Sequence, residues 1–466
     1  ACSSNNPQNT TVTLTRQGQP TFGNQYCATV TGICTTNGPD NYEENTYQGT
    51  VTLAPNQWVL STSQNARPAL ANIAGANNTD LYFEASLDNR NGLANTSPNF
   101  GSLPAVFVAY NQSINLAATA FDLDGDSLAY SLVSPLTACG AVSNYAAVPT
   151  ITIPPISGCS TVVTGLPAVY SPTYPLPSIQ TSGSCPSLTG MPYFNFNASN
   201  GTMKFTPAIY VPNSASFDGL NKYAVVVKID EWRRVGGTYR NIGSVRREMF
   251  LNVYDCGQNQ MPRFASTMQV YNMGTASTST VIPVQSGTAT SVIINANDGN
   301  TGQRLTFSAN SLGVPGVFTQ QTGPNTLALE FTPPAGLPDG VYYVTVKAED
   351  DNCPVKGMEM QTLAFRVTST ALSTRAKAKE LVSTAYPNPF ADQVHFSLLR
   401  PASGANQRVH IVDQLGRVVE QLAVPTGGAS PTAELSWRPA PGTPAGVYLA
   451  RFPEGQQTVR LLYLAR

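Results

Sequence analysis

The sequence predicts an all-β chain of several β-sandwich domains, from its composition and from the alternation of its apolar residues. Charged residues make up 11% of the 466 residues, and 37 Gly and 36 Pro supply frequent turns. Segments such as "TVTLTR" (11–16), "AVVVKID" (224–230) and "VYYVTVKAED" (341–350) have the period of two expected of half-buried strands. Because no long segment has a helical period, we expect strands in every domain.

Charge and hydropathy argue against nucleic acid as a partner and against a membrane-spanning helix. The formal net charge of -1 leaves no basic field for nucleic acid. No apolar run approaches the roughly 20 residues that a membrane-spanning helix needs, so no membrane span is expected. The first residue is Ala1 and not Met, which suggests a processed chain.

The cysteines predict disulfides and an oxidising compartment. They include no CxxC pair and no neighbouring histidine, so a zinc site is not indicated. The most plausible pairings by spacing are Cys27 with Cys34, one pair within Cys139, Cys159 and Cys185, and Cys256 with Cys353. Eight cysteines allow 105 connectivities, so these pairings are open.

An internal repeat divides the body of the chain. "FDLDGDSLAYSL" (121–132) resembles "ANDGNTGQRLTFSA" (296–309), and each is followed by "FTP" and a strand that ends in acids. The first copy is longer by about 50 residues, which include three cysteines. We therefore expect an N-terminal β domain (1–103), a first sandwich (104–258) with a Cys-rich insertion (about 139–190), a second sandwich (259–369), a linker (370–383) and a small C-terminal domain (384–466).

Three aspartates at alternate positions form the candidate metal site. Asp122, Asp124 and Asp126 share one loop with Gly125, and calcium prefers six to eight hard oxygen ligands. Asp230, or its neighbour Glu231, is expected to complete the set. The alternative is a polar turn with solvated carboxylates; we favour calcium here and the plain turn in the second copy, which keeps only Asp298.

The sequence contains few of the residue patterns that an enzyme active site needs. The only histidines are His395 and His410, both in the last domain, so nucleophilic triads in the body are not indicated. A glycoside hydrolase needs only two carboxylates and stays open as a minor alternative. The segment 230–247 interleaves arginines with Trp232 and Tyr239. This suits either a face that binds glycans or anions or a hairpin whose arginines lie on the solvent face and pair with acids across strands, and we favour the hairpin.

The last 80 or so residues resemble the C-terminal (type A) sorting domain of type IX secretion cargo. The matching motifs are "YPNPF" (386–390), "VHIVDQLGRVV" (409–419) and "GTPAGVYLARFPEGQQTVRLLYLAR" (442–466). The resemblance implies a small β-sandwich read by the type IX secretion machinery. It marks as motif residues Tyr386, Pro387, Asn388, Pro389, Phe390, Gly446 and Tyr448.

The body resembles large gliding-motility-associated surface proteins of bacteria with this secretion system. The matching segments include "DLYFEASLDNRNG" (80–92), "NTSPNFGSLP" (95–104), "NASNGTMKFTP" (197–207) and "VVVKIDEWRRVGGTYRNIGSVRREMFLNVYDC" (225–256). The resemblance implies tandem immunoglobulin-like or cadherin-like sandwiches and no single inherited activity. It also implies an extracellular location, at the cell surface or in an appendage of a Gram-negative bacterium.

We therefore expect a non-enzymatic structural or adhesive surface protein, self-assembling into an extracellular filament. The relatives usually begin further upstream, so a first domain that begins at Ala1 would lack its first strands. The strand edge left open could then pair with a strand of a neighbouring chain, as in donor-strand polymers. The alternative is a monomeric adhesin that binds surface glycans or another surface.

Overall fold

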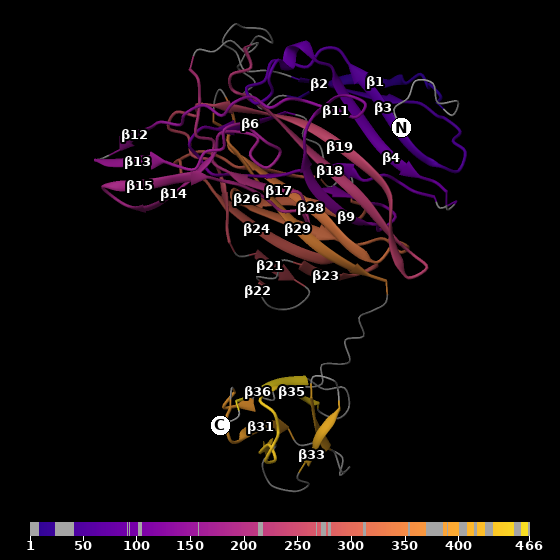
Figure 1. Cartoon of the computed structure of the whole chain (residues 1–466), viewed down its shortest axis with the longest axis vertical. Coiled ribbons are helices and arrows are strands. Elements are labelled where there is room, and N and C mark those ends of the chain that lie inside the picture. The colour runs from indigo at the N-terminus through magenta and orange to yellow at the C-terminus, as the bar shows by residue number, and fades with distance from the viewer. Residues whose placement is uncertain are drawn as a thin grey trace. The chain divides into compact units, whose positions relative to one another are not determined.

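The computed structural model describes the chain except residues 1–8, 24–41, 91, 93, 101–104, 157, 213–217, 267, 272–275, 278–280, 311–313, 353–354, 370–384, 389, 400–407, 414–416, 425–431, 452–457 and 465–466. The chain divides into two compact units, Ala1–Leu372 and Ser373–Arg466 (Figure 1). The described residues are almost entirely strands and turns, with one 3-10 turn at Ala76–Asn78, so the all-β prediction is confirmed.

The first sandwich has an eight-stranded sheet packed on a three-stranded sheet. The large sheet runs in the order β11-β10-β4-β19-β18-β9, with β3 on the outer side of β4 and β6 on β19, and the small one runs β16-β17-β7. Their bounds are β3 Gln57–Gln64, β4 Leu81–Asp88, β6 Ala105–Ala109, β7 Ile114–Ala117, β9 Ser127–Val133, β10 Leu136–Ala138, β11 Ala141–Val142, β16 Phe194–Phe196, β17 Thr202–Phe205, β18 Lys222–Val235 and β19 Thr238–Tyr254.

The β18–β19 hairpin is the longest element of this sandwich (Figure 1). Its turn is Gly236-Gly237, with φ of 58° and 88°. Both values lie in the left-handed region that a two-residue hairpin turn requires, which explains the glycine pair.

The expected boundary at residue 103 does not separate two sheets. β4, from the expected N-terminal domain, pairs antiparallel with β19, for example Leu87 with Gly243. Among the described residues, the part of the N-terminal region that forms its own sheet is β1 (Thr15–Gly23) with β2 (Tyr42–Gln48). Since β3 and β4 complete the large sheet, the N-terminal region belongs in part to the first sandwich.

The insertion in the first sandwich forms a four-stranded sheet of its own, which projects from the body (Figure 1). Its strands are β12 Ile153–Ile156, β13 Cys159–Val163, β14 Ile179–Ser184 and β15 Ser187–Pro192. β5 (Asn99–Phe100) and β8 (Ala120–Phe121) form a further short antiparallel pair.

The second sandwich also consists of two sheets, one of six strands and one of four. One runs β22-β21-β24-β27-β26 with β20 on β24, and the other runs β23-β29-β28-β25. Their bounds are β20 Arg263–Phe264, β21 Met268–Tyr271, β22 Ala276–Ser277, β23 Val281–Gln285, β24 Thr290–Asn297, β25 Thr306–Ala309, β26 Val317–Gly323, β27 Thr326–Phe331, β28 Gly340–Glu349 and β29 Met358–Thr368.

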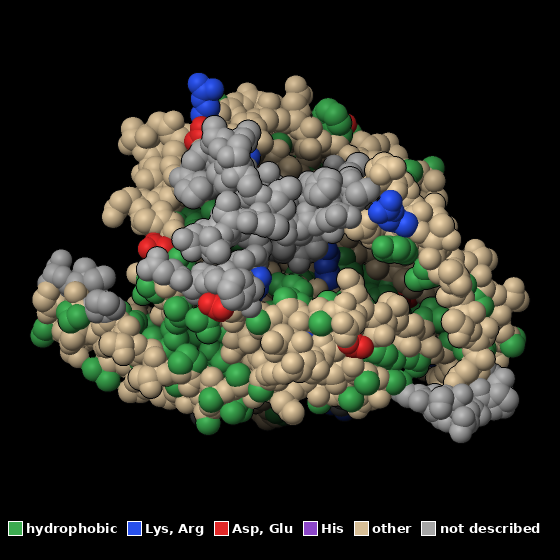
Figure 2. All heavy atoms as spheres, turned by 90° about the horizontal axis from the view of Figure 1, so that it is seen from above, with side chains coloured by type: hydrophobic (Ala, Val, Ile, Leu, Met, Phe, Trp, Pro, Cys, Tyr) green, Lys and Arg blue, Asp and Glu red, His purple; other side chains and the backbone are tan. Residues whose placement is uncertain are grey.

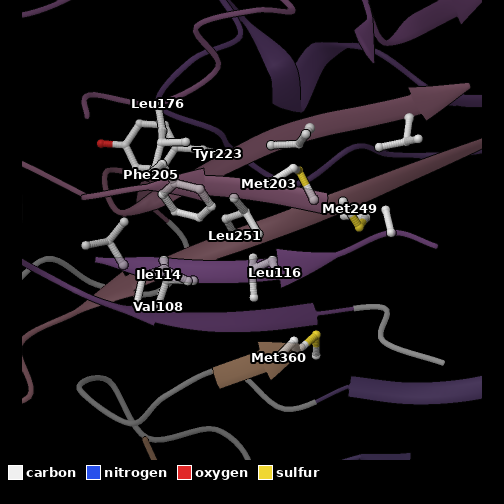
Figure 3. Close-up of a cluster of buried hydrophobic side chains, with 14 of the residues drawn as sticks. Val108, Ile114, Leu116, Leu176, Met203, Phe205, Tyr223, Met249, Leu251 and Met360 are labelled. Atoms are coloured by element: carbon white, nitrogen blue, oxygen red, sulfur yellow. The ribbon is translucent and has the colours of Figure 1, made fainter. Parts of the chain in front are cut away.

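The two sandwiches pack against each other inside the first unit. Met358 and Met360 of β29 belong to the core cluster of the first sandwich, and Figure 3 shows Met360 in the same cluster as Leu116. In the other direction, Phe121 of β8 is 5% exposed and belongs to the core of the second sandwich. We call this contact region the joint.

The second unit is a smaller sandwich. Its sheets run β30-β31-β34 and β33-β32-β35-β36, and Trp437, Phe390, Phe396 and Tyr448 are among the side chains of its core. The strands are β30 Ala385–Tyr386, β31 Val394–Leu399, β32 Arg408–Val412, β33 Val418–Ala423, β34 Thr432–Trp437, β35 Gly446–Arg451 and β36 Thr458–Tyr463.

Truncating Phe121 should weaken both sandwiches, because its ring lies in the core of the neighbour. We expect Phe121→Ala to lower the free energy of unfolding of the first unit by about 3 to 5 kcal/mol, measured by urea denaturation. Phe318→Ala is the control, since Phe318 is 63% exposed, and should cost less than about 0.5 kcal/mol. Equal losses in the two variants would contradict the described joint.

Candidate metal centre

The three aspartates lie together in the loop between β8 and β9. The ligand atoms of Asp122, Asp124 and Asp126 all lie within 4.8 Å of one another. Asp122 is 4% exposed, and its Oδ1 accepts the backbone N–H groups of Asp124 at 2.9 Å and Asp126 at 3.1 Å. The backbone turns at Gly125, whose φ of +77° is in the left-handed region. The loop therefore brings three carboxylates into one group.

Arg233, on β18, is the counter-charge of this group. Its Nη2 lies 2.6 Å from Asp126 Oδ2 and 3.0 Å from Asp124 Oδ2, and its Nε donates to Asp126 Oδ1 at 2.7 Å. The guanidinium also donates to the carbonyl oxygen of Ala94 at 2.6 Å and to Asn95 Oδ1 at 2.7 Å. Five oxygen atoms thus converge on one cation.

Glu231 is the fourth acid of the centre. It is fully buried, and its Oε2 accepts the side-chain amide of Asn95 at 2.7 Å. Burial, together with the charges of the neighbouring aspartates, raises the pKa of Glu231 to about 7 and that of Asp122 to about 6. The folded protein therefore holds acids that resist simultaneous ionisation.

Asp230, the expected fourth ligand, does not join the centre. Its carboxylate pairs with Lys228 Nζ at 2.7 Å. Successive side chains of a strand point to opposite faces, and on β18 the fully buried Val227 and Ile229 share their face with Glu231. The structure therefore places Glu231, and not Asp230, on the side of the aspartates.

The second sandwich has a corresponding loop with less charge. β20 pairs with β24 as β5 pairs with β8, so Asp298 occupies the position of Asp122 and Asn300 that of Asp124. Asn259 Nδ2 donates to the buried Asp350 Oδ2 at 2.8 Å, as Asn95 donates to Glu231. The backbone N–H of the next residue, Gln260, donates to Asn300 Oδ1 at 2.6 Å.

The cysteines follow the expected pairings only in part. Cys159 and Cys185 form a disulfide within the insertion, and Cys139 is also disulfide-bonded. Cys256 is a free thiol, contrary to the expected Cys256–Cys353 bridge, and its sulfur accepts the Nε2–H of Gln112 at 3.0 Å. Cys27, Cys34 and Cys353 lie outside the described residues.

The sorting-motif residues fasten the last strand of the second unit. Asn388 Oδ1 accepts the Leu462 N–H at 2.8 Å, and the Phe390 N–H donates to the Leu462 carbonyl at 3.0 Å. The Phe390 ring packs on Trp437 and Tyr463.

The other motif residues support the same small core. Tyr448 packs edge-on against Trp437 and donates its hydroxyl to the Pro444 carbonyl at 2.7 Å. Gly446 opens β35, Tyr386 belongs to β30 and precedes Pro387 across a cis peptide bond, and Pro389 lies outside the described residues.

Comparison with known proteins identifies the tail. Residues 384–461 match the family described as secretion system C-terminal sorting domain, so the predicted sorting domain is confirmed. It indicates an exported protein of type IX secretion, secreted or displayed at the cell surface. No curated protein matches the chain.

Solved structures similar to the chain are immunoglobulin-like and cadherin domains. They include the titin domains Z1Z2 in complex with telethonin (13% identity, 60% of this chain and 100% of that chain, TM-score 0.17). Human protocadherin-24 EC1-2 is 15% identical over 59% of this chain and 100% of its own, also with a TM-score of 0.17. The I-band fragment I67-I69 from titin is 8% identical over 80% and 99%, again with a TM-score of 0.17. Among the described residues, no helix is long and apolar enough to cross a membrane.

The raised pKa of Glu231 predicts a pH-dependent stability in the presence of a chelator. The folded state binds this proton more tightly than the unfolded chain, so ionisation above about pH 5 destabilises the wild type but not Glu231→Gln. We expect the free energy of unfolding of Glu231→Gln, relative to wild type, to rise by roughly 2 kcal/mol between pH 5 and pH 8. Urea denaturation across this range measures it, and a difference independent of pH would refute the assigned burial.

Proposed function

We propose that this chain is a non-enzymatic structural or adhesive protein of the bacterial surface, and that it assembles into an extracellular filament. The tail indicates export by type IX secretion. The body supplies stacked sandwiches, which suit a mechanical or presenting role. The observation that carries the filament proposal is the open edge of the large sheet at β3.

β3 pairs with β4 along its whole length, from Gln57 opposite Asp88 to Gln64 opposite Leu81. Its other edge has no strand partner among the described residues. Both faces of the strand are also exposed, including the apolar side chains of Val59 and Leu60. An open, apolar strand edge is a template for a strand of another chain, and a contact of that kind that does not close into a ring produces a filament.

The surface supports a protein that associates through uncharged contacts. Figure 2 shows one face on which charged side chains are few and scattered, among uncharged polar and apolar ones. This agrees with the 11% of charged residues in the whole chain. Without a strong field of one sign, chains of this protein do not repel one another over long distances.

The clustered acids do not favour a hydrolase. A glycosidase needs two carboxylates that reach the substrate from a cleft. In the described part of the chain, the clustered acids are Asp122, Asp124 and Asp126 with Glu231, of which Asp122 and Glu231 are buried and the other two are paired with Arg233. This arrangement supports a structural role for the acids.

The filament proposal is tested by electron microscopy of material sheared from cells, with intact-mass analysis of the same fraction. We expect regular filaments made of this chain with the sorting domain retained. Dispersed particles, or a mass that lacks the residues after about 385 of this numbering, would refute it.

A charged side chain introduced on the open edge of β3 should prevent filament assembly without affecting folding. Leu60→Lys should leave the free energy of unfolding within about 0.5 kcal/mol of wild type, because Leu60 is 43% exposed, while abolishing filaments. Leu220→Lys is the control, since Leu220 is equally exposed but lies in a turn. Filaments that persist in Leu60→Lys would show that β3 is not the contact.

A monomeric glycan-binding adhesin is the second candidate, because a shallow hollow lies beside the tip of the β18–β19 hairpin. The hollow has a volume of about 530 Å³, and its lining includes Trp232, Tyr239, Asn241 and the Asp88–Arg90 ion pair. Exposed aromatic rings beside planar hydrogen-bonding groups suit the apolar faces and hydroxyl groups of sugars.

The adhesin candidate predicts saturable binding to immobilised polysaccharides. Tyr239→Ala should weaken that binding at least about tenfold, since Tyr239 is 63% exposed and offers a free ring face. Tyr47→Ala, at another exposed tyrosine on β2, should leave it unchanged. Loss of binding in both variants, or in neither, would contradict a site at the hairpin.

A further inference from the structure

The aspartate loop lies at the joint between the two sandwiches. A Cβ atom added at Gly125 would lie 2.7 Å from Pro338 Cβ and 3.5 Å from the Tyr342 hydroxyl, both of the second sandwich. Residue 121, directly before the loop, is the phenylalanine buried in the second core. Anything that binds the loop therefore acts on the contact between the sandwiches.

Two buried carboxylate oxygens of the centre lack a hydrogen-bond partner. Asp122 Oδ2 and Glu231 Oε1 have no donor within the described residues, although both side chains are almost completely buried. Burial of an unsatisfied polar atom is costly, and it is more costly when the group is charged. The centre thus has an unmet demand for positive charge at its buried end.

The second sandwich shows that the fold does not require this charge. In both sandwiches a leading segment, "NTSPNF" (95–100) or "NQMPRF" (259–264), is held by an asparagine amide and by the next backbone N–H. In the second copy Asn300, at the position of Asp124, accepts the backbone N–H, and Gly302 stands at the position of Asp126. The two extra carboxylates of the first copy therefore need another explanation than holding this segment.

Arg233 neutralises only part of the centre. Four carboxylates and one guanidinium leave three negative charges when all are ionised. The oxygen atoms that converge on the guanidinium are carboxylate, amide and backbone carbonyl oxygens. Calcium prefers six to eight ligands of this kind, and the centre offers no thiolate or imidazole that would favour zinc.

We propose that the joint binds one Ca²⁺ ion through Asp122, Asp124 and Asp126, with Glu231 as the fourth carboxylate, and that the ion takes the place of the Arg233 guanidinium. The ion joins the loop of the first sandwich to β18 beside the contact with the second sandwich. Calcium thereby stiffens the joint. This inference is independent of filament assembly.

Calorimetric titration of the full chain with CaCl₂ tests the site. We expect one ion per chain, with a dissociation constant of about 10⁻⁴ to 10⁻³ M, as in extracellular modules. Asp124→Asn should weaken the affinity at least about tenfold, because it removes a charged ligand at a partly exposed position that does not threaten folding. No heat at about 10 mM Ca²⁺ would overturn the proposal.

Two matched variants locate the ion. Asp230→Asn removes the acid next to Glu231 that pairs with Lys228, and Asp298→Asn removes the equivalent acid of the second loop. Both should retain the wild-type affinity and stoichiometry. A loss of binding in either variant, with none in Asp124→Asn, would place the ion elsewhere and refute the assignment.

The Arg233→Gln variant tests whether Ca²⁺ can replace the guanidinium or whether Arg233 is the permanent counter-charge of the acids. Without Ca²⁺ the variant should melt at a lower temperature than wild type, because four acids lose their counter-charge. Added Ca²⁺ should raise its melting temperature by more than it raises that of wild type, by roughly 3 °C or more. If Ca²⁺ does not restore the melting temperature that Arg233→Gln loses, the acids are neutralised by Arg233 alone and the proposal is refuted.

Discussion

The burial of Phe121 in the neighbouring sandwich is the contact on which the organisation of the first unit depends. The residue ends a two-residue strand of one sandwich and fills the core of the next. Residues on either side of it are fixed as a consequence: the Thr119 hydroxyl lies 2.6 Å from that of Thr345, and Asp122 begins the loop at the joint. The buried ring thus lies directly before a polar centre that the first sandwich forms by itself, beside its contact with the second sandwich.

The internal repeat shows how one framework carries different chemistry. Each sandwich begins with a leading segment that an asparagine fastens to a buried acid, Glu231 in the first copy and Asp350 in the second. The hydrogen bonds are nearly the same length, so the backbone requirement is met in both. The added aspartates and Arg233 distinguish the first copy. Burial raises the pKa of Glu231 and Asp122, the charges of the neighbouring aspartates also raise it, and the charge of Arg233 lowers that of Glu231.

Alternation and repeats predicted the strands, the two sandwiches and the three clustered aspartates, because these depend on local sequence. The structure places Glu231, and not the expected Asp230, beside the aspartates. The alternation of β18 indicates this, because Val227 and Ile229 define its buried face and Glu231 continues it. The pairing of β4 with β19 joins residues far apart in the sequence. No local pattern therefore shows that β4 belongs to the first sandwich and not to a separate N-terminal domain. The hairpin prediction pairs its arginines with acids across strands, but it does not name Asp124 and Asp126 as the partners of Arg233, because that contact depends on long-range pairing.

The fastening of β36 by Asn388 and Phe390 has a consequence for the timing of export. The first and last parts of the sorting domain are joined by hydrogen bonds and share one core, so the complete fold contains both. A receptor that reads the folded domain has nothing to read until residue 463 has been synthesised.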